Sequence, residues 1–101
     1  MICIQVFLPL LNGRDASRHA RMIKNVKQEL IEQFGGVTAF VNTPAEGAWR
    51  KHRRTVNDRI VVIEVMTKRV NRAWWARYKR DLEKRLTQEE IVIRAIQVEL
   101  L

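Results

Sequence analysis

The stretch "RIVVIEVM", residues 59–66, decides the fold of this chain. Six of its eight residues are apolar, five of these are β-branched, and a single acid, Glu64, interrupts the run. Such a short, nearly continuous apolar run is typical of a strand buried on both faces at the centre of a sheet. A central strand needs a neighbour on each side, so the rest of the chain must supply further strands.

Three other segments have the composition of strands. Residues 2–9 alternate aliphatic side chains with Cys3, Gln5 and Phe7, and Pro9 ends the run. Residues 36–42, "GVTAFVN", predict a short second strand, and residues 90–101 predict a last one. Together with 59–66, these segments indicate a four-stranded sheet.

The segment between the two middle strands has turn chemistry and charge. Pro44 and Gly47 predict a loop over residues 43–47. We expect residues 48–55 to form an irregular extension of a hairpin and residues 56–58, "VND", to form a turn.

Two helices separate the strands. Turn and cap residues at 12–15 precede a helical stripe of apolar residues that ends at the Gly35-Gly36 pair. A second helix follows the cap residue Asn71, with an inner stripe of Trp75, Tyr78, Leu82 and Leu86. Consecutive helical positions differ by about 100°. Only Trp75 of the Trp74-Trp75 pair is therefore expected in the core.

The element order βαββαβ predicts one α+β domain over residues 1–101. Its natural arrangement is ferredoxin-like, a four-stranded antiparallel sheet with two helices on one face. The first and third strands are then central, and the fourth strand lies beside the first. This arrangement leaves the second face of the sheet without a helical cover.

Side-chain alternation assigns residues to the two faces of this sheet. The helix side is expected to hold Ile2, Ile4, Val6, Val61, Ile63, Val65, Ile91, Ile93 and Ala95. The open side is expected to hold Cys3, Gln5, Phe7, Thr38, Phe40, Ile60, Val62, Glu64, Met66, Val92, Arg94 and Ile96. The open side is mostly apolar, so it requires a cover, which could be a partner, a ligand or residues 42–57. A homodimer joined through this face is favoured, because two-fold pairing is the commonest solution.

Glu64, Gln5 and Arg94 are expected to form one polar row across the open face. As a catalytic pair, Glu64 would transfer a proton and Arg94 would stabilise developing negative charge, with no metal or cofactor. In the alternative interpretation, Glu64 and Arg94 pair and fix the register or the dimer contact, or a bulge sends one of them to solvent.

A ligand pocket at this row would have an apolar wall of Phe7, Phe40, Trp49 and Met66, with His52 at its border. Neither His19 nor His52 has a partner at catalytic-triad spacing, and both are expected at the surface. Cys3 is expected to be an inert strand residue. The sequence has no cysteine–histidine cluster and no glycine-rich phosphate loop, so it predicts neither a metal nor a cofactor.

The net charge of +8, from 19 Lys and Arg against 11 Asp and Glu, would attract polyanions. The cations concentrate on the predicted outer faces of the helices, at Arg14, Arg18, Arg21, Arg69, Arg72, Arg80 and Lys84. The alternative function is therefore a sequence-nonspecific nucleic-acid-binding protein. The same cations would also suit an ordinary solvated helix surface.

The single cysteine and the apolar first residues indicate the cellular compartment in which the protein is expected. One cysteine cannot form an intrachain disulfide, which fits a reducing cytoplasm. Residues 1–13 have no cationic leader and are too short to span a bilayer, so no membrane association is expected.

The motif "GAW" at 47–49, the acid Asp58 and the run "IVVIEV" at 60–65 are similar to a group of small uncharacterised bacterial proteins. The whole element order resembles the dimeric α/β-barrel superfamily. That resemblance implies ferredoxin-like domains paired through their sheets, often with small molecules bound, but it carries over no catalytic residue.

Two other ferredoxin-like groups fit less well. RNA-recognition domains place aromatic residues in a motif that residues 59–66 lack. CRISPR-associated nucleases of this fold carry an aspartate at the end of the first strand, where this chain has Phe7, Leu8 and Pro9.

Overall fold

The structure is a computed structural model that describes residues 1–10, 16–51, 54–87 and 90–101, with the side chains of residues 10, 16, 41–51 and 54–59 outside the description. Its elements are β1 (Ile2–Leu10), α1 (Ala16–Phe34), β2 (Thr38–Lys51), β3 (Arg54–Thr67), α2 (Arg72–Arg85) and β4 (Ile93–Gln97). The predicted βαββαβ order is confirmed.

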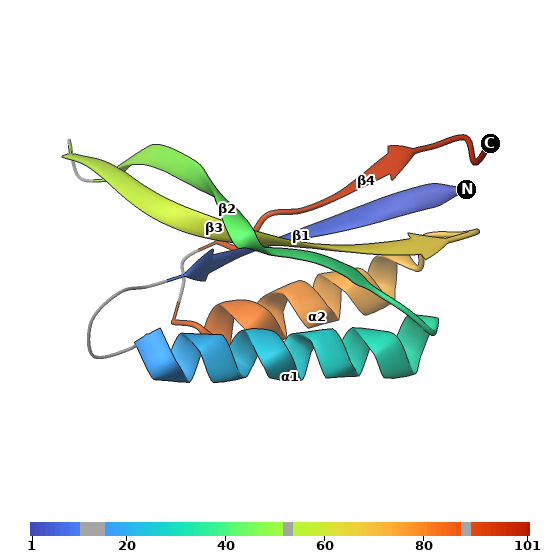
Figure 1. Cartoon of the computed structure of the whole chain (residues 1–101), viewed down its shortest axis with the longest axis horizontal. Helices are drawn as coiled ribbons and strands as arrows, with labels where there is room; N and C mark the ends of the chain where they lie inside the picture. Colours follow the sequence, from blue (N-terminus) through green and yellow to red (C-terminus); the bar gives the residue numbers. More distant parts are fainter. Residues whose placement is uncertain (11–15, 52–53, 88–89) are drawn as a thin grey trace.

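The four strands form one antiparallel sheet in the order β2-β3-β1-β4. The strands β1 and β3 are central and β4 lies beside β1, as predicted. Figure 1 shows both helices under one face of the sheet, while the other face has no helix. The chain is therefore an α+β protein with the ferredoxin-like arrangement.

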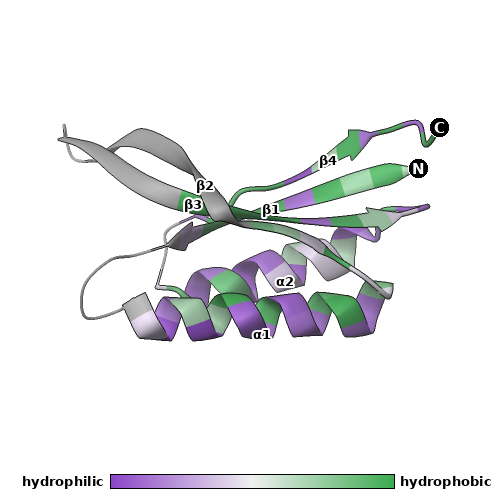
Figure 2. Ribbon diagram, viewed as in Figure 1, coloured by the Kyte–Doolittle hydropathy of each residue, from purple (hydrophilic) through white to green (hydrophobic). Residues whose placement is uncertain are grey.

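The core lies between the sheet and the helices, and the predicted alternation places most of it correctly. The central strands supply Ile4, Val6, Leu8, Val61, Ile63 and Val65, each at most 1% exposed. In Figure 2 the described parts of β1 and β3 are largely green, the colour of hydrophobic residues, whereas green and purple residues alternate along both helices. The buried helix residues Ile23, Val26, Leu30, Trp75, Leu82 and Leu86 belong to the same core cluster. Ala95 lies on the helix side by its pairing with Ile4, but it is exposed because β4 is an edge strand.

Local signals at the helix ends act as expected. The Asn71 side chain accepts a hydrogen bond of 3.0 Å from the backbone N–H of Trp74, which caps α2. The helix α1 ends at Phe34, and Gly35 follows with a φ of 87°, a conformation that favours glycine. The Gly35 N–H donates to the carbonyl of Ile31 at 2.7 Å. Both helix boundaries were thus predictable from single residues.

The adjacent tryptophans divide as predicted. Trp75 is buried and its ring stacks on Phe34 with centroids 5.3 Å apart. Trp74 is half-buried at the edge of the core, where it meets Phe34 edge-on and stacks on Tyr78. Helical geometry therefore separates the environments of two identical neighbours.

The predicted hairpin boundaries were wrong. Residues 43–47, predicted as a loop, lie within β2, and residues 56–58, predicted as a turn, lie within β3. Pairing is continuous from Ala45 with Ile60 to Lys51 with Arg54. A register shift between Phe40 and Ala45 accommodates the proline-containing segment, since irregular pairing tolerates a residue without an N–H. The strands thus extend further than turn-forming residues suggested.

His19, expected at the surface, is buried instead. Its ring Nδ1 lies 3.2 Å from the carbonyl oxygen of Pro9, at the end of β1. This contact gives a backbone carbonyl near the end of β1 a hydrogen-bond partner on α1, so His19 helps to hold the start of the helix against the strand.

Candidate functional site

The open face of the sheet is organised in three rows that run across the strands. Strand pairing places Thr38, Glu64, Gln5 and Arg94 side by side in the middle, and we call these residues the polar row. One flanking row is apolar and consists of Phe40, Val62, Phe7 and Val92. The other flanking row consists of Met66, Cys3 and Ile96. A polar band thus crosses an otherwise apolar surface.

Gln5 connects the two charged members of the polar row. Its Nε2 donates to Glu64 Oε2 at 2.6 Å, and its Oε1 accepts from Arg94 Nε at 2.6 Å. The predicted row therefore forms, although the predicted pairing of Glu64 with Arg94 is replaced by a bridge through Gln5. The amide donates to one partner and accepts from the other, so a carboxylate lies at one end of the bridge and a guanidinium at the other.

Arg94 is also held by an aromatic ring. Its guanidinium carbon lies 4.9 Å from the centroid of the Phe7 ring, within the range of cation–π attraction. Gln5 uses only the Nε of this guanidinium in the described contacts. Gln5 and Phe7 of the neighbouring strand β1 therefore position Arg94. Its terminal nitrogens remain able to bind an anion such as a carboxylate.

The apolar residues on this face stay largely in contact with solvent. Phe40 is 44% exposed, Met66 is 45% exposed and Val92 is 51% exposed. Phe7 and Val62 beside them are half-buried. Exposed apolar side chains therefore flank the polar row on both sides, an arrangement that often marks a surface for a partner or a ligand.

Two predicted pocket residues are Trp49 in the wall and His52 at the border. The backbone of Trp49 pairs with Val56 in the β2–β3 ribbon, but its side chain lies outside the described residues. His52 lies outside them altogether. The assembled part of the predicted site therefore consists of Gln5, Glu64, Arg94 and the apolar residues of the sheet.

Cys3 is buried, at 4% exposed, unlike its described neighbours in the three rows of the open face. Burial is the main cause that raises the pKa of its thiol, and the charge of Glu64 and a hydrogen bond to it add to the effect. A raised pKa disfavours the reactive thiolate. This environment suits a packing residue better than a nucleophile.

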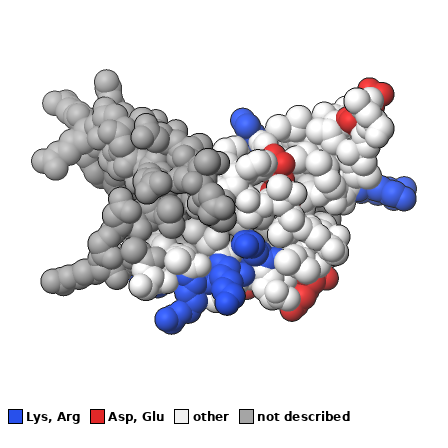
Figure 3. All heavy atoms as spheres, viewed as in Figure 1, with Lys and Arg blue, Asp and Glu red and all other residues white. Residues whose placement is uncertain are grey.

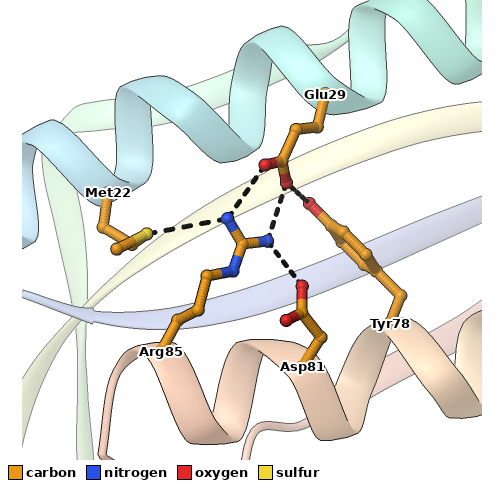
Figure 4. Close-up of polar contacts among 5 residues, drawn as sticks. All are labelled: Met22, Glu29, Tyr78, Asp81 and Arg85. Carbon is orange, nitrogen blue, oxygen red and sulfur yellow. Dashed lines mark hydrogen bonds and ion pairs between the residues drawn. The ribbon is translucent and has the colours of Figure 1, made fainter.

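A second polar cluster, which the sequence did not reveal, joins the helices and is drawn in Figure 4. Arg85 of α2 donates through two nitrogens to Glu29 of α1, at 2.7 and 2.9 Å. It also lies 3.0 Å from Asp81 and 3.7 Å from the Met22 sulfur, and Tyr78 donates to Glu29 at 2.8 Å. We call these five residues the helix clamp.

The electrostatics of the helix clamp favour the charged pair. Hydrogen bonds from Arg85 lower the pKa of Glu29, and Tyr78 adds to this effect. Hydrogen bonding to Glu29 raises the pKa of Arg85, and burial raises the pKa of Tyr78. Both charged side chains keep some exposure, so the clamp fixes how α1 and α2 sit together rather than forming a closed site.

One sequence signal pointed toward the clamp. Asp81 and Arg85 are four residues apart, which places them on one helix face. The partner Glu29 lies 56 residues away, so only the packing of the helices identifies it.

Exposed cations are distributed over the helices. They include Arg18, Arg21, Lys24, Arg72, Arg80 and Lys84. Figure 3 shows blue side chains on the helix side of the molecule. Lys79 also lies on α2, but its charge is paired, because its Nζ lies within 4.0 Å of carboxylate oxygens of Glu83 and Glu90. Arg14 lies outside the described residues.

Within the described ranges, no three residues of the types that bind metals come together as an ion site. The helices in those ranges are also too short or too polar to cross a bilayer.

Comparison with known proteins identifies fold relatives and no sequence relatives. No protein-family model and no curated protein matches the chain. The divalent cation tolerance protein CutA1 from Thermus thermophilus matches in structure with a TM-score of 0.59 and 14% identity, over 97% of this chain and 84% of that one. The PII-like protein CutA from Nostoc sp. PCC 7120, in apo form, matches with a TM-score of 0.57 and 15% identity, over 98% of this chain and 82% of that one.

A CutA1 variant from Pyrococcus horikoshii matches with a TM-score of 0.57 and 15% identity, over 100% of this chain and 86% of that one. At such low identity the likeness concerns the fold alone. The small ferredoxin-like architecture is thus shared along nearly the whole chain.

Proposed function

We propose that this chain acts as a homodimer joined through the open face of its sheet. The supporting observation is the exposed apolar patch on both sides of the polar row, with Phe40, Met66 and Val92 each more than two-fifths exposed. The opposite face already packs against both helices, so a further layer over the open face would bury these side chains. A second copy provides that layer with the same chemistry.

Analytical ultracentrifugation at micromolar concentration tests this proposal. Wild-type protein should sediment as a dimer, and Val62→Lys should dissociate it, because the new charge would be desolvated in the interface. Ala76→Lys is the matched control, since Ala76 is exposed on α2, away from the sheet. A monomeric wild-type protein, or equal behaviour of the two lysine variants, would contradict the homodimer.

A small-molecule site at the polar row is a second candidate, supported by the convergence of Gln5, Glu64 and Arg94. Ligand sites are mostly apolar with a few convergent polar groups, and this row has Phe7, Phe40 and Met66 beside it. Glu64 would transfer a proton, and Arg94 would stabilise negative charge on the substrate.

A thermal-shift screen of metabolites, run on wild type and on Glu64→Gln, separates this site from a purely structural row. A ligand that stabilises wild type but not Glu64→Gln, while both unliganded proteins melt alike, supports the site. If no ligand distinguishes the proteins and Glu64→Gln only changes dimer affinity or melting, the row is structural.

Binding of nucleic acid through the helix layer is the remaining candidate, supported by the exposed cations on both helices. Phosphate binding of this kind weakens steeply as salt rises and shows little sequence preference. Changing Arg72, Arg80 and Lys84 to glutamine should weaken binding to a random duplex uniformly. Absence of binding at about 0.1 M salt would exclude this function.

A further inference from the structure

We infer that two copies pair about a two-fold axis running along β1, so that Glu64 of each copy faces Arg94 of the other. The inference rests on the homodimer proposed above and adds its geometry. Both chains would then contribute to each polar row, because the Glu64 carboxylate of one copy would pair with the Arg94 guanidinium of the second copy.

The order of charges along the polar row carries the argument. Glu64 on β3, Gln5 on β1 and Arg94 on β4 lie on adjacent strands and are joined by hydrogen bonds of 2.6 Å. A rotation of 180° about a line along β1 reverses this order in the opposing sheet. Glu64 then lies over Arg94, Arg94 over Glu64, and Gln5 over Gln5.

A second axis that stacks the same faces with the strands aligned runs across the strands, along the polar row. It keeps the order unchanged, so Glu64 would lie over Glu64 and Arg94 over Arg94. Like charges opposed in an interface cost several kcal/mol in general, whereas opposite charges direct the register. Of these two axes, the axis along β1 is therefore favoured by the opposite charges of Glu64 and Arg94 on either side of Gln5.

The apolar rows fit the same axis. Rotation about β1 keeps each row at its own level, so Val62 of one copy would meet Val92 of the other, across Phe7. Rotation about the polar row would bring Val62 over Met66 instead. Stacked sheets lie about 10 Å apart, a separation that glutamate and arginine side chains can bridge from opposite sides. The two axes thus predict different neighbours at neutral positions.

Charge reversal tests the pairing. Glu64→Arg and Arg94→Glu should each weaken homodimerisation by roughly a hundredfold, since each variant opposes like charges twice. An equimolar mixture of the two should form heterodimers with near wild-type affinity, because both contacts become attractive. If either variant fails to fold, Glu64→Gln and Arg94→Gln should still each weaken the dimer about tenfold.

Cross-linking in a Cys3→Ala background tests the axis. With a short bismaleimide, Val62→Cys mixed with Val92→Cys should give a covalent dimer, and Val62→Cys mixed with Met66→Cys should not. The reverse pattern would overturn the axis. A monomeric wild-type protein would refute the homodimer itself, whereas a dimer that Val62→Lys dissociates but the charge-reversed mixture does not restore would refute only this pairing.

Discussion

Replacing Trp75 with alanine removes the aromatic ring that anchors α2 in the core. Trp75 is 7% exposed and its ring stacks on Phe34 at the end of α1, 5.3 Å between centroids. It also meets Trp74 and Tyr78 edge-on. The variant therefore loses apolar burial and aromatic contacts at the same time.

The magnitude follows from the buried surface. A buried tryptophan removes up to about 250 Å² from water, which at about 25 cal/mol per Å² is an upper bound of roughly 6 kcal/mol. The alanine side chain still buries part of this surface, and neighbouring residues relax into part of the space that the ring leaves. We therefore expect the free energy of unfolding to fall by about 3–5 kcal/mol. Trp74, half-buried by comparison, should lose roughly half as much when changed to alanine.

Urea unfolding followed by circular dichroism measures the two losses. Trp75→Ala should lower the midpoint markedly without changing the slope, and Trp74→Ala should lower it less. Trp75→Phe is the matched control, because it keeps a ring against Phe34 and should recover most of the stability. Equal losses for the two alanine variants would refute the assignment of Trp75 to the core and Trp74 to its edge.

Three further predictions concern single residues. Glu29→Gln should cost about 1 kcal/mol at pH 7, since Arg85 keeps one hydrogen-bond acceptor but loses a partly exposed ion pair. Because the folded protein lowers the pKa of Glu29 from its ordinary 4.5, the wild-type advantage is present above that pH and is lost as pH falls through the folded value, which acid titration of both proteins would show. Asn71→Ala should cost about 1 kcal/mol by removing the cap on the Trp74 N–H, with Asn71→Ser as a nearly neutral control in thermal melts. Cys3, buried and with a raised pKa, should react with a thiol reagent far more slowly than free cysteine, and a reaction rate equal to that in denaturant would contradict this.

The strand and helix pattern was predictable because local chemistry and long-range packing agree in most of the chain. The alternation in residues 2–9 and 59–66 assigned the core face, and Asn71 and Gly35 marked helix ends. The predicted hairpin boundaries were wrong because local preference and long-range pairing disagree there. Pro44 and Gly47 favour a loop locally, but pairing from Ala45 to Lys51 with β3 overrides that preference.

The candidate site was predictable only in part. Alternation placed Gln5, Glu64 and Arg94 on one face, and pairing then aligned them. Their hydrogen bonds depend on side-chain rotamers and on the amide of Gln5, which composition does not specify. The helix clamp was missed because Glu29 and Arg85 meet only through the packing of two helices, far apart in sequence.

The two chain ends lie close together, at the same end of the molecule in Figure 1. The Val98 N–H donates to the Met1 carbonyl at 2.9 Å, and Ile2 pairs with Gln97. A short glycine linker could therefore join them, and the chain could be opened at the exposed Gly35-Gly36 pair instead. In this circular permutant, the β1–β4 ladder would become a local hairpin rather than a contact between the extremes of the sequence. Lower contact order speeds folding, so the permuted chain should reach the same architecture by a faster route.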